Sequence, residues 1–216
     1  MLKAAAVASL LAGMFTKECT FTAPVVAVLL DWGVNATPPL SAVRRARPLL
    51  LCLPVCAWVA WSDLKFMKIP NKAVMAIVAV FAFAGFVLMP AEYWLWRWMN
   101  LVAVLAIGFL LNIAANVGAG DAKFAAAAAP YFAQRIEHLQ LALVLLAAFL
   151  LGAFAAHRLM RAIPAVREAT PDWVSWQRKD FPMGLALVGT FVAYLVFMAF
   201  PGILSLVQGA TGSTNM

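Results

Sequence analysis

Charged residues are scarce in this chain of 216 residues: 12% are Asp, Glu, Lys or Arg, whereas 65% are hydrophobic. Soluble globular domains carry roughly twice that share of charge, so the composition excludes a soluble domain. Only 9 residues are acidic against 16 basic ones, which gives a formal net charge of +7. The basic residues form no continuous stripe and lie in the breaks between apolar runs, so we expect no nucleic acid as a partner.

Cysteine and histidine are also rare. Three cysteines are too few for a disulfide framework or for a zinc site built from paired Cys-x-x-Cys motifs. Cys52 and Cys56 are four residues apart and would share one helix face, which favours two buried apolar thiols over half of a metal site. His138 and His157 flank one apolar run at opposite ends, so they cannot form a joint site. No metal site is predicted.

Long apolar runs separated by short polar breaks dominate the chain. This pattern predicts an all-α fold, a polytopic bundle of about six core transmembrane helices in the lipid bilayer. The predicted spans are residues 48–61, 72–89, 99–117, 122–132, 139–156 and 182–206. The fourth is short, alanine-rich and ended by Pro130, so we expect it to cross only half of the membrane. Residues 90–98, rich in tryptophan, are predicted to be a connection at headgroup level.

The ends of the chain differ from its middle. Residues 1–47 are an N-terminal apolar segment whose topology stays open between one tilted span, a hairpin in the membrane and an interfacial helix. Residues 48–206 are predicted to form one transmembrane domain. Residues 207–216 are small and polar, and we expect them to be a disordered tail.

Counts of lysine and arginine predict the orientation. If the loops that hold Asp63 and Asp121 face the cytoplasm, that side carries nine Lys and Arg residues, and the opposite side carries two, Arg97 and Arg135. Cytoplasmic loops are enriched in these residues, so we predict this orientation. An arginine cluster at residues 44–47 disagrees, because it would fall on the outer side.

Two carboxylates stand at the ends of apolar runs, where a charge is costly unless it has a partner or a function. Asp63 ends the first span, and Asp121 follows the glycine pair Gly118 and Gly120. Two spans separate the carboxylates, so both emerge on the same membrane face, at the ends of antiparallel neighbours. The other interpretation is that they are juxtamembrane residues neutralised by Lys65 and Lys123.

Two adjacent carboxylates have a defined chemistry. They cannot both ionise easily, so they share a proton. The ionised member can take a proton from water while the protonated member polarises a peptide carbonyl, as in aspartic proteases, and this needs no metal, nucleotide or other cofactor. The glycines before Asp121 would let a backbone approach the carboxylate. Lys123 either tunes the local field or anchors its helix at the headgroups.

The residues around the carboxylates resemble the motifs of the prepilin peptidases, also called type IV leader peptidases, which are membrane aspartic proteases. One motif is Gly-x-Gly-Asp, here Gly118 to Asp121. The other is Asp-x5-Ile-Pro-Asn, here Asp63 to Asn71, which marks Ile69, Pro70 and Asn71 as supporting residues. Four residues recur by chance, but the ordered pair with the expected membrane placement is specific.

A third match opens the last span. Pro182 and Gly184 fit the Pro-Tyr-Gly-Pro-Ala-Ile segment of the family, although Met183 replaces its tyrosine and Leu185 its second proline. The match is therefore partial. The whole resemblance extends over residues 58–200 and leaves the N-terminal apolar segment unmatched.

The resemblance implies an activity, a substrate and a location. It implies a peptidase domain in the bacterial inner (cytoplasmic) membrane, with Asp63 and Asp121 catalytic at the cytoplasmic face. The implied substrate is a prepilin or pseudopilin precursor, cut between a short basic leader and its hydrophobic helix. Longer members carry an N-terminal domain with paired cysteine motifs for N-methylation. This chain resembles the peptidase-only form that serves Flp-type (tight adherence) pili, and we do not expect N-methylation.

The remaining polar residues have other interpretations. Asn112 and Asn116 share one helix face, and either line a cleft near the second carboxylate or bond to neighbouring helices. Asp172 and Asp180 are rival carboxylates in a basic, solvated loop.

A small proton-coupled transporter would need mid-membrane carboxylates and an internal repeat, which are not evident here. A pilus-assembly scaffold with vestigial aspartates would differ only in activity.

Overall fold

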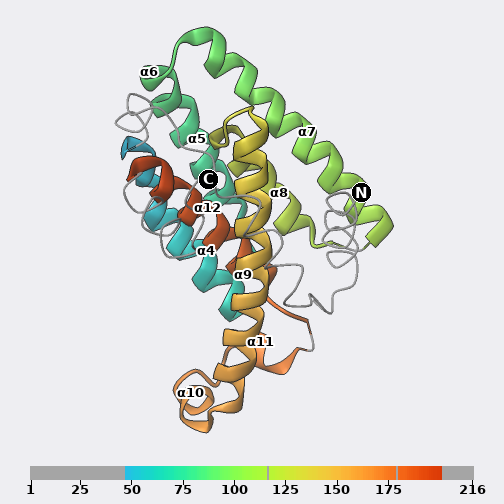
Figure 1. The fold of residues 1–216 in the computed structure, drawn as a ribbon. Coiled ribbons are helices and arrows are strands. Elements are labelled where there is room, and N and C mark those ends of the chain that lie inside the picture. The colour runs from blue at the N-terminus through green and yellow to red at the C-terminus, as the bar shows by residue number, and fades with distance from the viewer. Residues whose placement is uncertain (1–46, 116, 179, 201–216) are drawn as a thin grey trace, which may run out of the picture.

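A computed structural model gives the structure of the chain (Figure 1). It describes residues 47–115, 117–178 and 180–200, so the predictions for residues 1–46, Asn116 and the C-terminal tail lie outside the described residues. Every regular element in the described ranges is a helix, which confirms the all-α prediction. The division of the chain near residues 47 and 207 stays a prediction.

Four helical segments of the described residues are long and apolar enough to cross a membrane, and they make the chain a multi-pass membrane protein. Two shorter helices complete the bundle, so the predicted six helices are four long and two short ones. The long segments are η1 with α4 (Arg47–Cys52 and Leu53–Phe66), α5 with η2 and α6 (Asn71–Val80, Phe81–Gly85 and Phe86–Leu88), α7 (Ala91–Ala115) and α9 (Ile136–Ala162). The short ones are α8 (Ala119–Ala128), which η3 (Ala129–Tyr131) continues, and α12 (Met183–Ala199).

The prediction of a connection over residues 90–98 is wrong, because all but the first of these residues belong to α7. Pro90 stands directly before the helix, where proline is tolerated, and the next glycine or proline is Gly108. Nothing therefore interrupts the helix over its first four turns. Of its tryptophans, Trp94 and Trp98 pack on neighbouring helices, and Trp98 meets Phe81 edge-on with ring centroids 5.4 Å apart.

The core lies among α4, α5, α8 and α12, with α7 packed on α8 and α9 packed on α12 (Figure 1). Cys52 and Cys56 belong to this core as buried free thiols, which confirms their predicted apolar role. Gly108 brings α7 close to α8, because a Cβ atom there would lie 2.8 Å from the Cβ of Ala122.

Polar side chains of α7 and of the loop before α9 hold the far end of α8. The last carbonyl groups of a helix have no partner within the helix. Arg97 donates to the carbonyl of Tyr131 at 3.0 Å, and Asn100 donates to that of Phe132 at 3.1 Å. Gln134 in turn donates to the side-chain oxygen of Asn100 at 3.0 Å. These bonds stabilise the end of the short helix, whose half-length was predicted from Pro130.

We expect the Tyr131→Phe variant to lower the free energy of unfolding by about 1–3 kcal/mol. The buried Tyr131 hydroxyl donates to the carbonyl of Ile77 at 2.7 Å and lies 3.0 Å from the sulfur of Cys52. Thermal unfolding in detergent measures the change. Tyr93→Phe is the control, since Tyr93 is 67% exposed, and equal effects of the two variants would contradict the prediction.

Candidate active site

Two hydrogen bonds fix the conformation at the start of the connection between α4 and α5. Met67 ends α4 in the left-handed region with φ 54°, and its N–H donates to the carbonyl of Asp63 at 2.9 Å. The buried hydroxyl of Ser62 donates to the carbonyl of Lys68 at 2.8 Å. Pro70 then stands directly before α5 with an extended backbone. This short connection therefore holds Ile69 close to Asp63.

Asp63 is buried at the end of α4, where the residue is 5% exposed. Its Oδ2 accepts a hydrogen bond from the backbone N–H of Gly184, 121 positions later, at 2.9 Å. Pro182, also buried, precedes the first residue of α12, so Gly184 lies in the first turn, where backbone N–H groups have no partner within the helix. The carboxylate of Asp63 thus caps the N-terminus of α12.

Ile69 lies between α12, whose Gly184 bonds to Asp63, and α8, which carries Asp121. A Cβ atom at Gly184 would lie 3.1 Å from Cδ1 of Ile69, and one at Gly120 would lie 3.4 Å from Cβ of Ile69. Asp121, partly buried, is the third residue of α8, and its carboxylate folds back against Gly118, where a Cβ atom would overlap Oδ2. The three motifs named from the sequence therefore meet at one end of the bundle.

The lysine nearest to Asp63 has a different partner. Lys65 forms an ion pair with Asp172 at 2.7 Å. Asp172 lies in the segment after α9, which contains α10 (Pro164–Ala169) and α11 (Val174–Gln177). The hydrogen bond from Lys65 lowers the pKa of Asp172. The interpretation in which Lys65 neutralises Asp63 is therefore wrong. Asp172 is exposed and paired with a lysine, as expected for a carboxylate in a basic, solvated loop.

The remaining predicted residues lie around the same end. Asn112 donates to the carbonyl of Val117 at 2.6 Å, so it stabilises the turn that leads into Gly118. Lys123 is exposed on the first turns of α8, and Asn71 is exposed at the first position of α5. The place of Asn112 in a cleft and the role of Lys123 stay predictions.

Sequence reasoning missed Ser62, although its position beside Asp63 was a signal. We expect Ser62→Ala to lower the free energy of unfolding by about 1 kcal/mol, because the carbonyl of Lys68 loses its donor. Ser175→Ala is the matched control, since the buried Ser175 hydroxyl has no hydrogen-bond partner within the described ranges. Thermal unfolding compares the two, and a loss at Ser175 equal to that at Ser62 would contradict the prediction.

Comparison with known proteins identifies the family. Searches among curated proteins and among solved structures each found no match. A sequence model of the type IV leader peptidase family matches residues 50–157, half of the chain, and this range includes Asp63, Ile69 and Asp121. Gly184 lies beyond the match, so its place beside Asp63 comes from the structure alone. The chain belongs to the type IV leader peptidase family, and it is a membrane protease of that kind.

Proposed function

We propose that this chain is an aspartic endopeptidase that removes the basic leader from prepilin-like precursors. Asp63 and Asp121 form the proposed catalytic dyad. One arrangement carries the proposal: Gly184 bonds to Asp63, and Ile69 lies close enough to Gly184 and Gly120 to contact a Cβ atom at either position. Asp63 caps the N-terminus of α12, and Asp121 lies in the first turn of α8. Two carboxylates placed in this way at one end of a bundle suit proton transfer to and from a bound peptide.

The proposed reaction is a hydrolysis that uses one proton held between the carboxylates. The ionised member of the dyad takes a proton from water, and the water oxygen attacks the peptide carbonyl, which the protonated member polarises. Breakdown of the tetrahedral intermediate then releases the new amino terminus, which takes up the proton that the dyad took from water. The dyad ends with one proton, as it began, so it is ready for the next substrate.

The proposed location of this reaction is the cytoplasmic face of a bacterial inner membrane. Two observations support it. Lys65, Lys68 and Lys72 surround the connection after Asp63, and Lys123 is exposed on the first turns of α8. Cations gather on the cytoplasmic side of membrane proteins. The other rim of the bundle carries Gln134 and Arg135.

The test is cleavage of a precursor by the purified protein in lipid vesicles. An Flp-type pilin precursor with its leader and hydrophobic segment is the first substrate to use. We expect mass spectrometry to find two fragments cut on the leader side of the hydrophobic segment. An intact precursor after incubation with folded, vesicle-embedded protein would overturn the proposal for this substrate class.

A further inference from the structure

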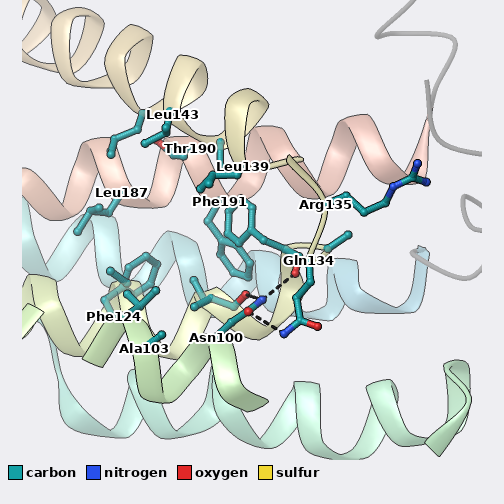
Figure 2. A pocket seen from close by; sticks show the side chains of 18 of the residues that line it. Asn100, Ala103, Phe124, Gln134, Arg135, Leu139, Leu143, Leu187, Thr190 and Phe191 are labelled. Carbon is teal, nitrogen blue, oxygen red and sulfur yellow. Dashed lines mark hydrogen bonds between the residues drawn. The ribbon is translucent and has the colours of Figure 1, made fainter. Parts of the chain in front are cut away.

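An apolar groove opens between α7 and α9, beyond the candidate active site. Its volume is about 550 Å³, within the range of roughly 300–1,000 Å³ that ligand sites occupy. Figure 2 shows its lining: Ala103 from α7, Phe124 from α8, Leu139 and Leu143 from α9, and Leu187 from α12. Leu139, at the edge of the groove on the membrane-spanning α9, is 53% exposed, so the groove is open on that side of the described residues.

The groove continues the helix faces that carry the site motifs. Ala125 and Ala128 line it four and seven positions after Asp121, so all three share one face of α8. Leu187 and Phe191 line it three and seven positions after Gly184, on one face of α12. An occupant of the groove therefore lies along the two faces that end at the proposed dyad.

The polar groups at the far end of the groove already form hydrogen bonds or an ion pair within the chain. Asn100 donates to two carbonyls of the chain, and Gln134 donates to the carbonyl of Trp96 as well as to Asn100. The guanidinium of Arg135 points away from the groove in Figure 2 and pairs with Glu137 at 3.5 Å. None of these described polar groups is arranged to hold a phosphate headgroup, which argues against a lipid as the specific occupant.

We propose that this groove binds the hydrophobic helix of the precursor, an inference that rests on the proposed function. Alanines form the floor along α8, and small residues allow close packing of helices in membranes. From Ala129 to Asp121 the floor is about 12 Å long at 1.5 Å per residue. A helix docked along it presents the peptide bond at its cytoplasmic end to the dyad.

Photocrosslinking tests where the precursor binds. A benzophenone amino acid replaces Leu139 at the groove or, as a control, Ile107 on the outer side of α7, which is 55% exposed. Both are placed in the Asp121→Asn background, where the precursor stays intact. We expect a strong crosslink to the hydrophobic segment from position 139 and at most a weak one from position 107. Equal crosslinking, or crosslinks from position 139 only to lipid or to a second copy of the chain, would overturn the inference.

Filling the groove gives an independent result. We expect Ala125→Leu to raise KM about tenfold or more with kcat nearly unchanged, because the added side chain occupies the floor. Ala106→Leu adds the same atoms to an exposed position outside the groove and leaves KM unchanged. A fall in kcat alone would place the effect at the dyad and overturn the inference. Cleavage by the unaltered chain is measured in parallel, so failure of the groove and failure of the proposed function give different results.

Discussion

The variants Asp63→Asn and Asp121→Asn are each expected to cleave the precursor about 10²- to 10⁴-fold more slowly than the unaltered chain. Each change removes a group that transfers a proton in the proposed reaction. The double variant is expected to be no slower than either single one, because the two carboxylates act as one unit. Initial rates of precursor cleavage in vesicles measure all three.

These variants should remain folded, which makes a loss of rate interpretable. Asn at position 63 keeps a carbonyl oxygen that can accept the N–H of Gly184. Glu92→Gln is the matched control, since it also changes a carboxylate to an amide, but at an exposed position in the first turn of α7. Cleavage by either Asp variant at the rate of the Glu92 variant would remove that aspartate from the mechanism.

The Gly184→Ala variant is expected to lower kcat by about a hundredfold while changing stability little. The added methyl carbon would lie 2.8 Å from Oδ2 of Asp63 and 3.0 Å from its Cγ. The end of a side chain moves more easily than a backbone, so we expect the Asp63 carboxylate to shift and the fold to persist. A displacement of about 1 Å at a reacting group is enough for such a loss.

Gly152→Ala is the control for this substitution. A Cβ atom at Gly152, on α9, has nothing within 4 Å, and alanine favours a helix interior by up to about 1 kcal/mol over glycine. This variant should keep full activity and gain slightly in stability. If Gly184→Ala cleaved as fast as Gly152→Ala, the contact between α12 and Asp63 would have no part in positioning the carboxylate.

Local patterns predicted some elements well and failed at one. The half-length of α8 followed from Pro130, and the buried state of Cys52 and Cys56 followed from their spacing in an apolar run. The tryptophan-rich stretch before residue 99 was interpreted as a connection because aromatic residues gather at headgroup level. Composition indicates where residues prefer to lie in the membrane. Whether a helix continues through them depends instead on the absence of a helix breaker, and this is why α7 already begins at Ala91.

The sequence alone did not predict which charged residues form an ion pair. Lys65 and Asp63 are neighbours in the chain, yet Lys65 meets Asp172, which the return of the chain after α9 brings to the end of α4. Proximity along a chain predicts a contact only when no distant residue competes for the same group. Here the competing residue is 107 positions away, so the choice depended on tertiary packing.

The sequence by itself determined the class of this protein and predicted the chemistry that we propose for it. Apolar runs long enough to cross a membrane require helices, and two spans between Asp63 and Asp121 require both to emerge on one face. The tertiary structure alone decided what surrounds them. The bond from Gly184 to Asp63 and the place of Ile69 beside Gly120 join residues from separate helices. Such contacts depend on how helices pack in three dimensions, and no local periodicity records that.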